Sequence, residues 1–75
     1  MLEKIRDILK DYTEVPAEKI TPQSHFRNDL GLNSLDVVNV VVAFEDEFDI
    51  EIDDDDISSM VRVEDAIRYI TERCQ

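Results

Sequence analysis

Apolar residues recur along the chain at the three- and four-residue spacing of amphipathic helices. The first such stretch predicts a helix over residues 2–14, because Pro16 pushes the residue before it out of helical geometry. Its apolar stripe is Leu2, Ile5, Ile8, Leu9 and Tyr12. A connection that contains two prolines and one glycine follows, up to Asn33, and we expect apolar side chains to anchor it to the core. These anchors are Ile20, Phe26, Leu30 and Leu32.

The longest apolar stretch predicts a second helix over residues 34–48. Its valines would favour a strand on propensity alone, but the period of the stripe is helical. The stripe consists of Val37, Val40, Val41, Phe44 and Phe48. Asn33 is a good N-cap residue, and Asp36, three positions later, can complete a capping box. A further apolar row is rotated away from the stripe and is expected to face solvent: Leu35, Val38 and Val42.

Two more helices complete the pattern. The acidic run 53–56 can cap a short helix through about Ser59, with Ile57 and Met60 turned inward. A last stripe predicts a helix over residues 63–73, in which the acids of the first turn must compensate for a poor cap at Arg62 through the helix dipole. That stripe is Val63, Ala66, Ile67, Ile70 and Cys74. We therefore expect a single domain, residues 1–75, folded as an all-α four-helix bundle with three longer helices and one short helix.

The charge of the chain is concentrated in one stretch. Residues 28–61 contain eleven acids and no Lys or Arg, so they account for the whole formal net charge of −11. Such a field repels nucleic acid and anionic membranes and attracts basic protein surfaces. The acids do not match the twelve-residue calcium loop in any register, because no glycine falls at the sixth position. We therefore expect no specific metal site, only weak and delocalised divalent binding.

Few residues can support catalysis or a disulfide. The chain has one histidine, His25, and one cysteine, Cys74. A serine nucleophile needs an adjacent base, and none is near Ser34 in sequence, so we expect no catalytic activity. His25 is interpreted as a packed or capping residue, and Cys74 as the last residue of its stripe or an exposed thiol. With no signal-peptide pattern and no apolar run near the ~20 residues that span a bilayer, we expect a cytoplasmic monomer without membrane insertion.

The run Asp29-Leu30-Gly31-Leu32-Asn33-Ser34-Leu35-Asp36 resembles the signature of the acyl carrier protein family, in which Asp-Ser-Leu follows a glycine and opens an acidic second helix. The resemblance covers the whole chain, including the acidic helix end 44–48 and the segment 50–53. It implies that Ser34 is linked through a phosphodiester to 4′-phosphopantetheine, whose thiol holds an acyl group as a thioester. For Ser34 the alternative is a helix-capping serine without chemistry.

The resemblance also implies two further sets of residues. A partner-recognition face would meet basic patches on a phosphopantetheinyl transferase and on ketosynthase and acyltransferase type enzymes of fatty-acid, lipid or polyketide biosynthesis. This face comprises Asn33, Leu35, Asp36, Val38, Val42, Glu45 and Asp46. A second set would line or border the space that accepts an acyl chain, with ordinary core packing as the alternative. It comprises Val37, Val41, Phe44, Ile52, Ile57, Met60 and Ala66.

Two positions depart from the family pattern. Asn33 stands where the family most often has Asp, and Asn39 stands where carriers of primary fatty-acid synthesis usually have Glu. We interpret both as tuning toward a different partner set, such as a specialised lipid or polyketide pathway. The cargo and the pathway stay open at this point. Two other functions also stay open: a carrier of aminoacyl or peptidyl units, and an unmodified acidic helical adaptor that docks on basic proteins.

Overall fold

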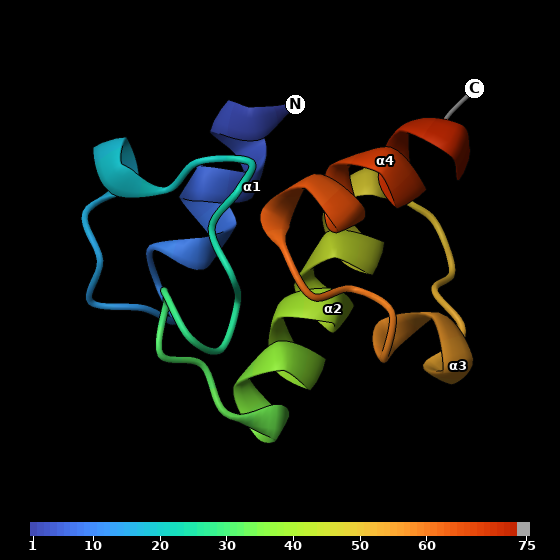
Figure 1. Cartoon of the computed structure of the whole chain (residues 1–75). Helices are drawn as coiled ribbons and strands as arrows, with labels where there is room; N and C mark the ends of the chain where they lie inside the picture. The colour runs from blue at the N-terminus through green and yellow to red at the C-terminus, as the bar shows by residue number, and fades with distance from the viewer. Residues whose placement is uncertain (74–75) are drawn as a thin grey trace.

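The computed structural model describes residues 1–73, and this range contains four α-helices and one short 3-10 helix. The helices are α1 (Leu2–Leu9), α2 (Ser34–Phe48), α3 (Asp54–Ile57) and α4 (Val63–Arg73), and the 3-10 helix is η1 (Ala17–Lys19). Helix α2 lies in the middle, with α1 on one side and with α3 and α4 on the other (Figure 1). No strand occurs in the described range, so the predicted all-α bundle of three longer helices and one short helix is confirmed.

One core joins these helices to the long connection. The side chains of Val40, Val41 and Phe44 from α2 are almost fully buried in it. The four predicted anchors of the connection are at most 5% exposed. The loop between α1 and α2 is therefore held by its own apolar residues, as the sequence predicts. The buried apolar set is Ile5, Leu9, Ile20, Phe26, Leu30, Leu32, Val40, Val41, Phe44, Ile52, Met60, Val63, Ala66 and Ile70.

Helix α1 is shorter than predicted. It ends at Leu9 instead of residue 14, and Tyr12 is 37% exposed instead of completing the stripe. The Thr13 hydroxyl donates a hydrogen bond to the carbonyl of Leu30 at 2.7 Å and accepts one from the N–H of Val15. Threonine side chains compete with helical hydrogen bonds in this way, and here the partner is a residue of the distant connection. The end of α1 is thus set by a tertiary contact.

The start of α4 is capped by main-chain groups of the connection. The N–H groups of Val63 and Glu64 donate to the carbonyls of Ser24 and Pro22 at 3.0 and 2.8 Å. The Asp65 carboxylate also accepts hydrogen bonds from the main chain just before the helix. Asp65 therefore stabilises the helix start through direct hydrogen bonds as well as through the helix dipole. The carbonyls of Ser24 and Pro22 supply the acceptors that a side chain at Arg62 does not.

Helix α3 ends at Ile57, two residues before the predicted end. Met60 is buried as expected, whereas Ile57 is only partly buried. The predicted place of Cys74 at the end of the last stripe lies outside the described residues. Within residues 1–73, no helix is long and apolar enough to cross a membrane.

Candidate functional site

The main chain before α2 places Ser34 at the surface. Gly31 has a positive φ of 71°, which L side chains rarely adopt, and it turns the chain toward the helix. Leu32 is buried, and its N–H donates to the carbonyl of Phe26 at 3.1 Å. Asn33 is extended and serves as the N-cap, so Ser34 is the first residue of α2 and is exposed. The buried Leu32 before Ser34 and the N-cap at Asn33 therefore fix the turn that exposes the serine.

A complete capping box holds this helix start, as the sequence predicts. The N–H of Asp36 donates to Oδ1 of Asn33 at 2.8 Å, and the N–H of Asn33 donates to Oδ2 of Asp36 at 3.2 Å. Among residues 1–73, the N–H groups of Ser34 and Leu35 have no acceptor. Two main-chain donors at the positive end of the helix dipole are thus free beside the Ser34 hydroxyl, an arrangement that favours an anion there.

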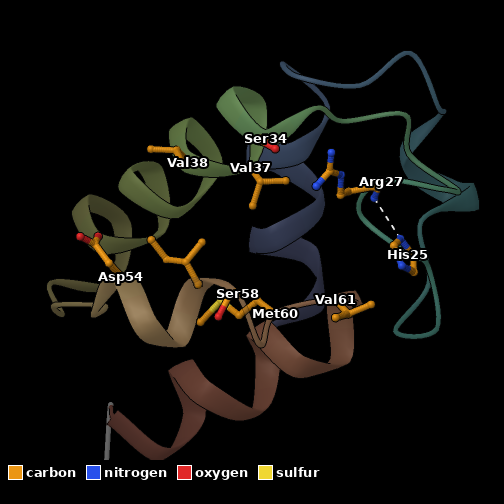
Figure 2. A pocket seen from close by; sticks show the side chains of 10 residues that line it. His25, Arg27, Ser34, Val37, Val38, Asp54, Ser58, Met60 and Val61 are labelled. Carbon is orange, nitrogen blue, oxygen red and sulfur yellow. Dashed lines mark hydrogen bonds between the residues drawn. The ribbon is translucent and has the colours of Figure 1, made fainter.

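A cavity of about 670 Å³ opens beside Ser34. Its walls come from the connection, α2, α3 and the segment before α4 (Figure 2). Five apolar side chains contribute to the lining: Val37, Val38, Ile57, Met60 and Val61. The polar lining consists of His25, Arg27, Ser34, Asp54 and Ser58. The cavity therefore offers an apolar wall to a flexible group attached at Ser34.

The acyl-pocket candidates divide into two groups. Val37, Ile57 and Met60 line the cavity. The other four candidates lie buried in the core and do not contribute to the lining: Val41, Phe44, Ile52 and Ala66. The cavity residues that the sequence analysis missed include His25 and Arg27, which belong to the connection and reach α2 only through the fold. No local motif marks them, so no sequence signal could have found them.

The partner-recognition candidates lie along the outside of α2 and at its start. Leu35, Val38 and Val42 are 68%, 44% and 48% exposed, as predicted for the row that faces solvent. Asp46 is exposed, and so is Asn33. The two other acids also have structural roles. Asp36 completes the capping box, and the Glu45 carboxylate accepts a hydrogen bond from the N–H of Ile52 at 3.0 Å.

His25 has a capping role, in line with its interpretation from sequence. Its Nδ1 atom accepts hydrogen bonds from the N–H groups of Arg27 and Asn28 at 3.1 and 3.0 Å. The Asp29 carboxylate in turn accepts from the N–H of His25 at 2.7 Å. His25 and Ser34 line the same cavity, yet no hydrogen bond joins their side chains in the described part of the chain. The hydrogen bonds that the histidine makes therefore organise the turn at residues 25–29.

The acidic residues do not form a metal centre in the described range. Within residues 1–73, no three His, Cys, Asp or Glu side chains are grouped so that they could hold an ion. Several of the acids instead accept hydrogen bonds from the main chain or from Tyr69. The acidic stretch is thus a charged surface together with a set of local caps.

Most of the chain is similar to known carrier proteins. The sequence model of the family described as "Phosphopantetheine attachment site" matches residues 3–70. The chain belongs to the acyl carrier protein family. It is 42% identical over 71 residues to the acyl carrier protein of Nitratidesulfovibrio vulgaris strain DP4 and 46% identical to that of strain Miyazaki F. Each match covers 95% of this chain and 93% of the relative.

The fold agrees with this assignment. A solved structure of the acyl carrier protein from Enterococcus faecalis superimposes with a TM-score of 0.83 at 32% identity. The match covers 96% of this chain and 91% of the other. The resemblance noted from sequence is therefore confirmed, and membership of the acyl carrier protein family implies a 4′-phosphopantetheine prosthetic group.

The residues beside Ser34 fit this group. Its phosphodiester needs a hydroxyl that solvent can reach and hydrogen-bond donors for the charged oxygens, and the start of α2 provides both. The rest of the arm and its cargo need apolar surface close by, which the cavity provides. The acyl carrier protein family works with biosynthetic enzymes and is modified by a phosphopantetheinyl transferase.

Proposed function

We propose that this acyl carrier protein family member holds acyl groups as thioesters on a 4′-phosphopantetheine arm attached to Oγ of Ser34. One observation carries the choice of residue: Ser34 is the exposed first residue of α2, next to an apolar cavity, inside the matched range 3–70. When bound, the arm supplies the thiol that forms the thioester. The chain itself is non-catalytic in this proposal, since no base is bonded to the Ser34 hydroxyl in the described residues.

The protein's own groups position and shelter the arm. The free N–H groups of Ser34 and Leu35 stabilise the negative charge at the attachment point. Val37, Ile57 and Met60 offer apolar surface to the acyl chain, because they line the cavity that begins at Ser34. The acyl-pocket candidates that lie in the core, Val41, Phe44, Ile52 and Ala66, would take part only if the core rearranged around them, since it is packed against them now.

The exposed row of α2 supports a docking role. Leu35, Val38 and Val42 form an apolar strip at the surface, and acids such as Glu45 and Asp46 lie at the far end of the same helix. We propose that a phosphopantetheinyl transferase and ketosynthase and acyltransferase type enzymes contact this strip through apolar patches with basic rims. Opposite charge would raise the rate of encounter, while the apolar contacts would supply most of the affinity.

The comparisons favour acyl cargo over the two alternative functions. The curated relatives are named acyl carrier proteins, and the family model describes an attachment site. An aminoacyl carrier or an unmodified adaptor would not be expected to show this combination. We further propose that residues 1–75 act as one carrier domain, which the single core of the helices supports. We also propose that the protein is a cytoplasmic monomer, and the lone cysteine fits a reducing compartment.

Intact mass measurement tests the attachment site. The wild type, Ser34→Ala and Ser58→Ala would each be incubated with a broad-specificity phosphopantetheinyl transferase, coenzyme A and Mg²⁺. Ser58 is the matched control, because it is also an exposed serine that lines the cavity. We expect one phosphopantetheinyl increment on the wild type and on Ser58→Ala, and none on Ser34→Ala.

Circular dichroism would verify that all three proteins are helical and unfold cooperatively. A folded wild type without the increment would refute the proposal and favour the adaptor. An increment that persists in Ser34→Ala would show that another residue is modified.

A further inference from the structure

Arg27 is a positive side chain that has no side-chain partner among residues 1–73 of this strongly acidic protein. Six of the eight Lys and Arg side chains form an ion pair or a hydrogen bond. Among residues 1–73, only Lys19 and Arg27 have no side-chain partner. With 19 acids available in the sequence, an exposed guanidinium that pairs with none of the described ones requires an explanation.

Asp29 and Asp36, which lie before and after Ser34 in the chain, each accept a main-chain hydrogen bond, whereas Asp54 lies on the α3 side of the cavity. The Asp29 carboxylate accepts the N–H of His25 at 2.7 Å, and the Asp36 carboxylate accepts the N–H of Asn33 at 3.2 Å. Both bonds stabilise the turns that present Ser34. Neither carboxylate forms an ion pair with Arg27 among residues 1–73, so the guanidinium is available to another anion.

The turn at His25 directs Arg27 into the site. The N–H of Arg27 donates to Nδ1 of His25 at 3.1 Å, and the carbonyl of Arg27 accepts the N–H of Gly31. Its main chain is therefore held on both sides. Arg27 and Ser34 line the same cavity, and Figure 2 shows the guanidinium extending from the connection toward Ser34 and Val37.

The lining of the cavity has a positive side chain, Arg27, at one end and a negative one, Asp54, at the other. Figure 2 shows Arg27 on the side of Ser34 and Val37, and Asp54 on the side of α3. Ile57 adds apolar lining. A phosphodiester at Ser34 would add a negative charge next to Asp36, which the capping box holds in place. A cation nearby would relieve this repulsion, and arginine suits a phosphate because its planar fork can donate two hydrogen bonds.

We propose that Arg27 is a positioning residue that pairs with the phosphodiester of the arm on Ser34 and directs the arm into the cavity between α2 and α3. This inference rests on the proposed function of Ser34. The free N–H groups of Ser34 and Leu35 bind the phosphate from the helix side, and the guanidinium binds it from the side of the connection. Loading the arm thus gives Arg27 the partner that it lacks in the protein alone.

Two NMR measurements on apo and holo protein test the pairing. Intact mass first establishes that the holo sample carries the arm. In isotope-labelled wild type, we expect the Nε–H signal of Arg27 to shift on loading, whereas that of Arg68, which pairs with Asp65 outside the cavity, stays in place. In phosphorus NMR, we expect the phosphodiester signal of holo Arg27→Gln to differ from that of the wild type, and holo Arg27→Lys to fall between them.

Salt and a matched variant make the phosphorus measurement specific. The difference between wild type and Arg27→Gln should be large at about 0.01 M salt and small at about 1 M, where the Debye length is about 3 Å. Lys19→Gln is the control, because Lys19 also lacks a side-chain partner in the described range but does not line the cavity. Its phosphorus signal should match that of the wild type at both salt concentrations.

Each failure has its own signature. A loaded wild type with an unshifted Arg27 signal, or equal phosphorus signals in wild type and Arg27→Gln, overturns the pairing and leaves the proposed function intact. Slower loading of Arg27→Gln with an unchanged phosphorus signal also overturns it, and assigns Arg27 to a contact with the transferase. A folded wild type that is never loaded overturns both proposals. If Arg27→Gln does not fold, the wild-type Arg27 signal decides alone.

Discussion

The Glu45 carboxylate accepts a hydrogen bond from the main-chain N–H of Ile52 at 3.0 Å. This bond joins the last turns of α2 to the segment that leads into α3, and Glu45 is only partly exposed. Asp46 is its neighbour in sequence, is exposed and has no side-chain bond in the described range. The two acids have the same charge, but only Glu45 also holds the main chain in place. Substituting each acid in turn therefore distinguishes an effect on partner recognition from an effect on stability.

Charge reversal at these two positions should have different effects. We expect Asp46→Lys to slow loading by a phosphopantetheinyl transferase at low salt without lowering stability. Glu45→Lys should slow loading and also lower the free energy of unfolding by about 1–3 kcal/mol, because the N–H of Ile52 loses its acceptor. Loading rates at several salt concentrations and urea unfolding measure both effects.

Glu14→Lys is the control for the charge change, since Glu14 is exposed and lies outside α2. Its loading rate should stay close to that of the wild type. If the loading rate of Asp46→Lys equals that of the wild type and does not depend on salt, the electrostatic part of the docking proposal is wrong.

The outer and inner apolar rows of α2 should respond in opposite ways to truncation. Leu35→Ala removes a side chain that is 68% exposed, so stability should change by no more than about 0.5 kcal/mol. Its affinity for a partner enzyme should fall about tenfold, or about 1.4 kcal/mol. Phe44→Ala removes a fully buried ring and should lower stability by about 3–5 kcal/mol. Urea unfolding and binding titrations measure the two quantities, and unchanged affinity in Leu35→Ala would contradict the docking role.

The left-handed main chain at Gly31 should tolerate few side chains. Apart from Gly31 and the two residues next to it, no described atom lies within 4 Å of the position that a Cβ would take, so the cost of a substitution is conformational and not steric. We expect Gly31→Ala to lower the free energy of unfolding by about 1–2 kcal/mol, and Gly31→Asn to lower it less. Asp49 is the converse case, with a φ of 54° at the end of α2, and Asp49→Gly should raise stability. Equal stability of all four proteins in urea would refute this interpretation.

Tyr69 should make the fold sensitive to alkaline pH. Its hydroxyl donates a hydrogen bond to the Asp56 carboxylate at 2.9 Å, which joins α4 to α3. Burial raises the pKa of Tyr69 above its ordinary value, and the bond to Asp56 acts in the same direction. The folded state therefore holds the proton more tightly than the unfolded chain. Its contribution is complete below about pH 10, the pKa of a free tyrosine, and is lost as the pH rises through the folded pKa.

Tyr69→Phe should accordingly lower stability by about 1 kcal/mol at neutral pH and weaken the loss of stability above about pH 10. Thermal unfolding at a series of pH values measures both changes. Tyr12→Phe is the control, because Tyr12 is 37% exposed and its hydroxyl has no hydrogen bond among residues 1–73. An equal pH dependence of Tyr69→Phe and wild type would show that the Asp56 bond does not hold α3.

Periodicity was sufficient for α2 and α4 because each of these helices carries its own signals. The capping box at Asn33 and Asp36 and the buried stripe of α2 are local features, and the structure contains both. The solvent-facing row of α2 follows from the same period. Where a rule acts within one or two turns of the chain, the sequence alone is enough.

Errors arose where distant segments compete with local preference. The end of α1, which was predicted wrongly, depends on the bond between Thr13 and Leu30. The start of α4 was predicted correctly, although it too has distant partners, the carbonyls of Pro22 and Ser24. None of these partners is close in sequence to the helix that it caps. Spacing rules contain no information on such contacts, so they placed the end of α1 five residues too late.

The sequence by itself determined the bounds of α2 and α4, the exposed serine at the start of α2 and the acidic field around it, because periodicity, capping and charge are properties of short segments. Only the tertiary structure decided which side chains surround Ser34. It brings Arg27 and His25 from the connection to the cavity, and it leaves Val41, Phe44, Ile52 and Ala66 in the core instead of the cavity wall. The physical reason is that a cavity wall is made by packing elements against one another, and that packing depends on contacts between residues far apart in the chain.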